Sequence, residues 1–99
     1  MSGLNMKLVN RGDTAEIYLI GRLDVLAATE AEKALLGAAE RFRNITLDLA
    51  ELSYVSSAGL RAIKRLYVTM MKKGGECKVV NIPQPIMNIF EVTGFINLL

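Results

Sequence analysis

The fold of this chain is decided by ITLDLAELSYVSSAGLRAIKRLYVTMMKKGG, the stretch from Ile45 to Gly75. Its first part alternates apolar Ile45, Leu47 and Leu49 with polar residues, which is the period of a half-buried strand. From Leu60 onward the apolar residues recur every three or four positions, which is the period of a helix. The stretch therefore predicts a strand, a short polar turn and a long helix.

The polar turn carries two adjacent serines, Ser56 and Ser57, where the predicted helix begins. The first amides of a helix lack internal partners, and the helix dipole is positive there, so a phosphate is favourable at this point. Arg61 opposes the dipole but faces the same side as Ser57, so an anion explains it better than helix stability does. Two roles remain open for Ser57: a phosphate-bearing hydroxyl, or only an N-cap worth about 1 kcal/mol.

Length and composition indicate one folded domain. The chain has 99 residues, of which 52% are hydrophobic, and we expect a single domain over residues 1–99. No apolar run approaches the roughly 20 residues that cross a bilayer, and no leader precedes the fold, so we expect no membrane span. The single cysteine, Cys77, cannot form an internal disulfide, which favours a reducing, cytoplasmic setting.

The composition also argues against catalysis and nucleic-acid binding. There is no histidine, so serine–histidine and cysteine–histidine sites are excluded, and no residues have the spacing of zinc ligands. Gly74 and Gly75 lack the lysine–serine pair of a phosphate-binding loop. A net charge of +2 and few aromatic residues give no basis for binding nucleic acid directly. We therefore expect that the protein is not an enzyme and that it binds no metal and no cofactor.

The rest of the chain continues the alternation of strands and helices. Thr29 and Glu32 fit a capping box for the first helix, Gly74-Gly75 ends the second, and Gly94 ends the third. The order is ββαβαβα, which predicts an α/β fold with a mixed sheet of four to five strands, flanked by three to four helices. The expected strands are 5–10, 16–20, 45–49 and 76–81, and the expected helices are 29–42, 58–73 and 83–92.

Two further expectations concern packing. The last residues, Phe95 to Leu99, either add one more short strand or cover the core. The core is expected to contain the apolar residues Leu47, Leu49, Leu60, Ile63, Tyr67, Val79 and Ile89.

Several segments of the chain, in order and spacing, resemble those of STAS domains. This family comprises the bacterial anti-sigma factor antagonists and the cytoplasmic tails of sulfate-type anion transporters. The similarity covers nearly the whole chain and implies a STAS-like fold. The matching segments are Gly21-Arg22-Leu23-Asp24, Leu47-Asp48-Leu49, Leu52 to Leu60, Gly74-Gly75 and Val92-Thr93-Gly94.

The antagonists of this family typically carry an acidic residue, a serine or threonine, a small residue, glycine and leucine. On this chain the phosphorylated position falls on Ser57 and the acidic one on Ser56, which is a departure and makes Ser56 an alternative acceptor. Asp24 matches a family aspartate near this loop, although a turn or a remote cap explains it equally well. The resemblance implies a partner-binding surface containing Asp24, Ser56, Ser57, Ala58, Gly59 and Arg61.

The resemblance implies a regulatory protein. As an anti-sigma factor antagonist, the unphosphorylated chain would bind a serine-kinase anti-sigma factor and release a sigma factor, and a serine phosphatase would restore this form. The alternative is an accessory module that regulates a membrane transport system through the same surface.

Overall fold

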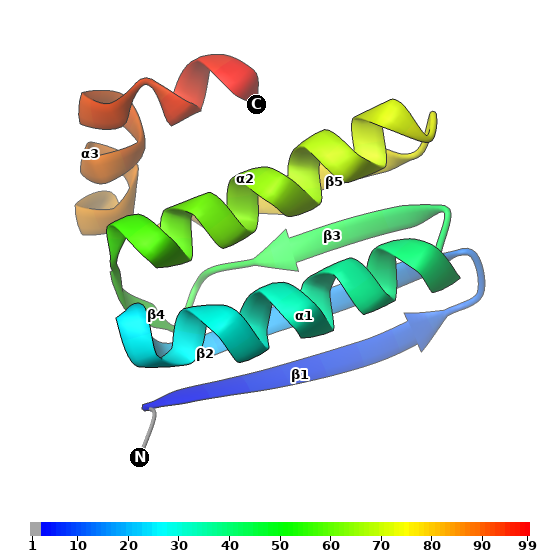
Figure 1. The fold of residues 1–99 in the computed structure, drawn as a ribbon, viewed down its shortest axis with the longest axis horizontal. Helices are drawn as coiled ribbons and strands as arrows, with labels where there is room; N and C mark the ends of the chain where they lie inside the picture. Colours follow the sequence, from blue (N-terminus) through cyan, green and yellow to red (C-terminus); the bar gives the residue numbers. More distant parts are fainter. Residues whose placement is uncertain (1–2) are drawn as a thin grey trace.

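The computed structural model of the chain describes residues 3–99, so Met1 and Ser2 of the predicted domain lie outside the described residues. After an initial hairpin, strands and helices alternate along the chain, except that β3 leads directly into β4 (Figure 1). The elements are β1 (Leu4–Arg11), β2 (Thr14–Leu23), α1 (Val25–Arg41), β3 (Asn44–Asp48), β4 (Leu52–Val55), α2 (Ser57–Lys72), β5 (Glu76–Val80), α3 (Gln84–Thr93) and the 3-10 helix η1 (Phe95–Leu98).

The strands form one mixed five-stranded sheet, as the sequence predicted. Its order is β1-β2-β3-β5, and β4 pairs separately with β2. The β1–β2 hairpin is antiparallel, and the other pairs are parallel. Strand β2 is long enough to serve two partners: Thr14 to Tyr18 pair with β3, and Gly21 to Leu23 pair with β4.

The change of partner along β2 occurs at Gly21. The register shifts there, and the residue has a φ of +100°, which favours glycine. A Cβ at this position would lie 2.0 Å from the carbonyl oxygen of Gly3. The bulge therefore depends on glycine, and it allows the end of β2 to reach β4.

Helices α1 and α2 run side by side over the sheet, and the core lies between these layers (Figure 1). Helix α3 stands at the end of the molecule where β4 leads into α2 (Figure 1). The rings of Phe90 and Phe95 meet edge to face with centroids 4.8 Å apart, which holds η1 against α3. Helix α3 and η1 thus form a wall beside the start of α2.

The predicted core residues divide into two groups. Leu47, Leu49 and Ile63 are fully buried. The others are half-buried and pack against the core, because they lie at the borders of helix faces or on the edge strand β5. These are Leu60, Tyr67, Val79 and Ile89.

The predicted start of the first helix is wrong. Helix α1 begins at Val25, and its N-cap is Asp24, whose Oδ1 accepts a hydrogen bond from the Ala27 amide at 2.9 Å. Thr29 therefore lies one turn inside the helix and cannot form a capping box with Glu32. The first turn carries exposed Val25, so it lacks the apolar–polar periodicity by which sequence reveals a helix.

Two other segments differ from expectation. Leu52–Val55, expected as part of a polar turn, forms β4, in which Leu52 and Val55 are buried. The chain end does not add a strand: Phe95–Leu98 is a 3-10 helix, and buried Phe95 covers the core. Gly94 ends α3 in the left-handed conformation, as predicted. Within residues 3–99, none of the helices combines the length and the apolar character that a membrane crossing requires.

Leu49→Asp tests the buried position directly after β3. Leu49 is 0% exposed, and burying an unpaired carboxylate costs several kcal/mol, a large part of a typical 5–15 kcal/mol stability. We expect the variant to be unfolded at room temperature by circular dichroism. Ala50→Asp, at the exposed next residue, is the control and should melt within a few degrees of the wild type. An unchanged melting temperature for Leu49→Asp would contradict the burial of Leu49 where the chain leaves β3.

Candidate functional site

The candidate site lies where two neighbouring parallel strands end and two helices begin. Leu23, at the end of β2, pairs with Val55, at the end of β4. The chain leaves the sheet at Asp24 toward α1 and at Ser56 toward α2, and the Ser56 amide donates to the Leu23 carbonyl oxygen at 2.9 Å. This pairing brings the two helix N-termini to one edge of the sheet.

Ser56 is the N-cap of α2. Its Oγ accepts a hydrogen bond from the Gly59 amide at 3.0 Å, and its carbonyl oxygen accepts one from the Leu60 amide at 2.8 Å. Only 7% of the residue is exposed. The capping role that the sequence left open for Ser57 therefore belongs to Ser56, and the hydroxyl of Ser56 is committed to it.

Ser57 is the first residue of α2 and is exposed. Its side chain makes no hydrogen bond to any part of the chain between residues 3 and 99. Of the two serines, Ser57 is thus the one whose hydroxyl is accessible to a modifying enzyme. Its position at the helix N-terminus also favours a negative charge.

Gly59 sets how closely α2 approaches the end of β2. The residue is buried, and a Cβ built on it would lie 2.6 Å from both Cγ and the carbonyl oxygen of Leu23. Ala58, beside it, is half-buried and lines a shallow cleft between α1 and α2. Both residues therefore position the serine turn, and Gly59 presents no side chain to a partner.

The two predicted charged residues of the surface have different environments. Asp24 is half-buried and caps α1, so it has a structural role of its own. Arg61 is exposed and lines the same hollow as Ser57. One turn further along α2, Arg65 pairs with Glu32 at 3.6 Å, whereas Arg61 has no ion-pair partner among residues 3–99. Arg61 is consequently available to an anion.

Exposed apolar side chains adjoin this edge, and sequence analysis did not assign them to the surface. Val25 and Leu26, directly after Asp24, are 66% and 76% exposed. Tyr54, just before the serine turn, is also exposed, and the Arg22 guanidinium lies 4.3 Å from the centre of its ring. The sequence does contain a signal for Val25 and Leu26: they are two large apolar residues that follow an aspartate and do not fit the apolar stripe of the helix.

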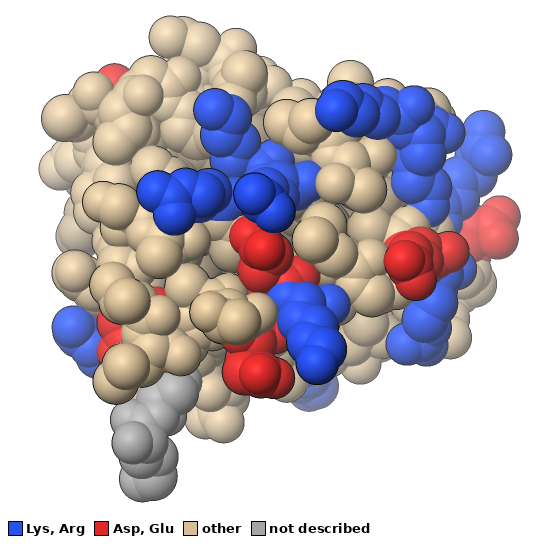
Figure 2. Space-filling view, viewed as in Figure 1, with Lys and Arg blue, Asp and Glu red and all other residues tan. Residues whose placement is uncertain are grey.

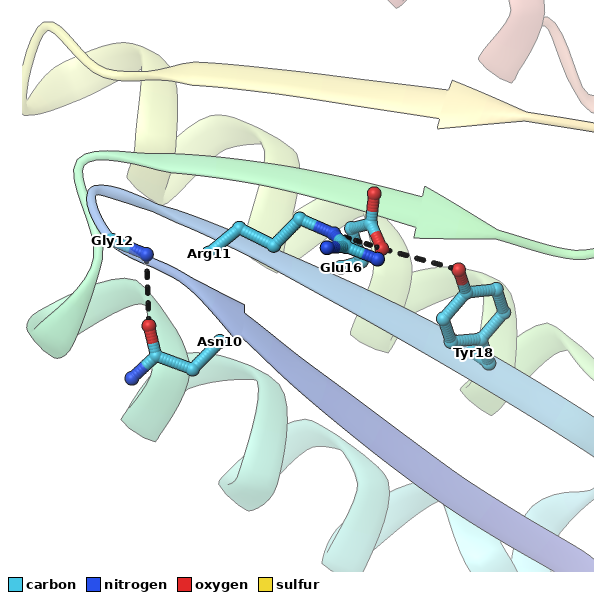
Figure 3. A network of polar contacts seen from close by, with 5 residues as sticks. All are labelled: Asn10, Arg11, Gly12, Glu16 and Tyr18. Carbon is cyan, nitrogen blue, oxygen red and sulfur yellow. Dashed lines mark hydrogen bonds and ion pairs between the residues drawn. The ribbon is translucent and has the colours of Figure 1, made fainter.

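The polar cluster on the β1–β2 hairpin is separate from the serine turn (Figure 3). Arg11 Nε donates to Glu16 Oε1 at 2.9 Å, and the Tyr18 hydroxyl donates to the same oxygen at 3.3 Å. The Glu16 carboxylate raises the pKa of Tyr18 and of Arg11. Asn10 Oδ1 accepts from the Gly12 amide at 2.9 Å, which closes the turn. These contacts hold the hairpin together.

The one cysteine offers no nucleophile at neutral pH. Cys77 is buried in β5, and burial raises the pKa of its thiol to about 11, so the thiol stays protonated. Residues 3–99 also contain no group of three or more histidine, cysteine, aspartate or glutamate side chains that could hold a metal ion.

Comparison with known proteins identifies the family and the fold. The family model of the STAS domain matches residues 5–99. The anti-sigma-B factor antagonist of Bacillus subtilis (strain 168) is 24% identical over 91 residues, which cover 92% of this chain and 84% of that protein. A putative anti-sigma factor antagonist, BtrV, of Bordetella bronchiseptica is 32% identical over 56 residues, which cover 57% of this chain and 48% of that protein.

Solved structures of anti-sigma factor antagonists share the fold. SpoIIAA in its unphosphorylated form gives a TM-score of 0.72 at 20% identity, covering 89% of this chain and 81% of that one. The phosphorylated form of Bacillus SpoIIAA gives 0.74 at 20% identity, with coverages of 96% and 86%. A putative antagonist from Thermotoga maritima gives 0.82 at 17% identity, with coverages of 95% and 80%.

Gly59→Ala tests the contact between α2 and the end of β2. The added Cβ would meet the Leu23 carbonyl oxygen at 2.6 Å, and backbone cannot move aside as a flexible side chain can. We expect a loss of about 1–3 kcal/mol in the free energy of unfolding, measured by urea titration. Gly37→Ala is the matched control, because it lies inside α1 with nothing within 4 Å, and it should gain up to about 1 kcal/mol. Equal effects of the two substitutions would contradict the close approach at Gly59.

Proposed function

The chain belongs to the STAS domain family, and we propose that it is an anti-sigma factor antagonist whose binding is switched off by phosphorylation of Ser57. In the unphosphorylated form it binds an anti-sigma factor that is also a serine kinase, and the sigma factor held by that kinase is released. The kinase phosphorylates Ser57, and a serine phosphatase restores the binding form. Because sigma factors act with RNA polymerase, this function places the protein in the cytoplasm.

The observation that carries the proposal is that the two adjacent serines have different roles in the structure. Ser56 is buried and caps α2, whereas Ser57 is exposed with a hydroxyl that makes no internal hydrogen bond to residues 3–99. A phosphate on Ser57 brings a charge of about −1.5 to −2 to the surface without disturbing the cap. In a contact surface, such a charge adds a desolvation cost and repels acidic groups of a partner.

The named relatives support this function over the transport alternative. The curated relatives described above are called anti-sigma factor antagonists. The TM-scores to the unphosphorylated and phosphorylated structures, 0.72 and 0.74, are nearly equal. One fold therefore accommodates both forms, which supports a switch that acts through surface charge.

We propose that the partner contacts the exposed residues of this edge. Ser57 and Arg61 lie on its surface, and half-buried Asp24 and Ala58 lie at its border. Ser56 and Gly59 belong to the proposed surface as buried residues that set the backbone path of the serine turn. The exposed apolar residues Val25 and Leu26 adjoin the surface and suit the desolvated centre of an interface.

Substitutions at Arg61 and Asp24 test the surface. Arg61→Glu should weaken binding of the kinase at least tenfold while the melting temperature stays within about 1–2 °C, because Arg61 is exposed and unpaired among residues 3–99. Asp24→Asn removes the charge of the side chain and keeps a good N-cap for α1. Weaker binding by this variant would therefore report the lost charge and not a loss of stability. Isothermal titration of both variants against the purified kinase measures the effect. Wild-type affinity in both variants would show that the partner uses another surface.

The decisive experiment concerns Ser57. Incubation with the cognate kinase and ATP should place phosphate on Ser57, detected by phosphopeptide mapping, and Ser57→Ala should bind the kinase but resist modification. Ser57→Asp should weaken binding as a partial mimic, whereas the full phosphate should weaken it by roughly two orders of magnitude, a coupling of about 3 kcal/mol. Asn5→Asp adds the same charge on exposed β1 and should bind normally.

Three outcomes would change the proposal. Phosphate found only on Ser56 would move the switch by one residue and would require the cap of α2 to open. Equal binding by Ser57→Ala and Ser57→Asp would remove phosphorylation of Ser57 as the switch. Failure of the unmodified chain to bind any kinase anti-sigma factor, with capture of a transporter subunit, would favour the transport alternative.

A further inference from the structure

Ser57 shares a surface hollow with two basic side chains. The hollow has a volume of about 400 Å³ and lies between the first two turns of α2 and the wall formed by the end of α3 and η1. None of its lining residues is acidic. The lining residues are Ser57, Leu60, Arg61, Lys64, Thr93, Gly94, Phe95 and Leu98.

The spacing of Ser57, Arg61 and Lys64 places all three on one face of α2. They are separated by four and then three residues, the intervals at which side chains of a helix are neighbours. Lys64 begins about 10 Å further along the axis than Ser57, and helical side chains lean toward the N-terminus. The long Lys64 side chain therefore extends in the direction of Ser57.

Arg61 and Lys64 are not used by the fold. Both are exposed, and neither has a hydrogen bond or an ion pair with any residue between 3 and 99. Of the other cations of α2 and its end, Arg65 pairs with Glu32, and Lys73 Nζ donates to the backbone carbonyls of Ala39 and Phe42, whereas exposed Lys72 has no such partner among residues 3–99. Figure 2 shows basic side chains gathered along α2, with acidic ones lying toward α1.

We propose that this hollow is the receptor of the phosphate on Ser57, and that Lys64 and Arg61 of the same chain bind the phosphate oxygens. This inference rests on the proposed function, since it takes Ser57 as the modified residue. Leu60, Phe95 and Leu98 supply the apolar part of the lining. Lys64 is then a phosphate-positioning residue that the motif around Ser57 does not include.

The proposal changes how the switch works. Two free cations oppose a phosphate of about −1.5 to −2, so the charge of the hollow falls from about +2 to nearly zero. Phosphorylation then neutralises a basic surface that the partner would contact and occupies part of the hollow, in place of presenting a bare dianion. The partner element that fits the unmodified hollow is accordingly acidic, with an apolar side against Leu60 and Phe95.

The test measures the second ionisation of phosphoserine by a pH titration followed by phosphorus NMR. Phosphoserine is inserted at position 57 of the full chain during synthesis, so no kinase is needed. In the otherwise wild-type chain we expect a pKa roughly half a unit to one unit below the ordinary value of about 6, because nearby cations favour the dianion. Lys64→Gln should raise the phosphoserine pKa again by about half of that shift, and Lys64→Arg should keep the lowered pKa. High salt should reduce the shift, since these groups are partly exposed.

Lys72→Gln is the matched control, because it removes the same charge from the same helix but does not line the hollow. It should leave the shift unchanged, and all variants should melt like the wild type, as Lys64 and Lys72 are exposed. An ordinary phosphoserine pKa in the wild type, or equal effects of Lys64→Gln and Lys72→Gln on that pKa, would overturn the proposal that the hollow binds the phosphate. A lowered phosphoserine pKa that depends on Lys64, together with no phosphorylation of the chain by any kinase, would contradict the proposed function but support phosphate binding in the hollow.

Discussion

The arrangement of the site depends on the junction between the end of β2 and the start of α2. The Ser56 amide donates to the Leu23 carbonyl oxygen, and Gly59 lies against the same residue with no room for a side chain. Leu23 is fully buried, so the junction is anchored in the core. If these two elements separated, Asp24 and Ser57 would no longer lie at one edge, and the cap of α2 would lose its buried setting.

The start of α2 carries positive charge that no acidic side chain of its first turn offsets, whereas Asp24 places a carboxylate at the start of α1. Neither α1 nor α2 has an acidic residue in its first turn, and the first turns of α2 instead carry Arg61 and Lys64. Both cations lie in the second turn of α2, where the helix dipole acts on them only weakly, because its effect falls off within the first turn. Arg61 and Lys64 make no hydrogen bond or ion pair within residues 3–99, so both remain free to bind the phosphate proposed on Ser57.

The sequence predicted the layered α/β fold well because the helices and four of the five strands carry their own periodicity. Strand β4 was missed because its four residues read buried, exposed, exposed, buried, and it is a strand only through pairing with β2 beyond the Gly21 bulge. That pairing joins residues some thirty positions apart, which no local pattern contains. The start of α1 was missed because Val25 and Leu26 face solvent, so they interrupt the apolar stripe that marks the helix.

The choice between the two serines likewise required the three-dimensional structure. Either serine could cap α2 on sequence grounds, and burial assigns the cap to Ser56. An aspartate at this position would cap the helix equally well, but its carboxylate would stand permanently beside a phosphate on Ser57. Serine provides the same hydrogen bond to the Gly59 amide without a charge. Under the proposed phosphorylation of Ser57, the uncharged cap at Ser56 would leave both cations of the hollow to the phosphate.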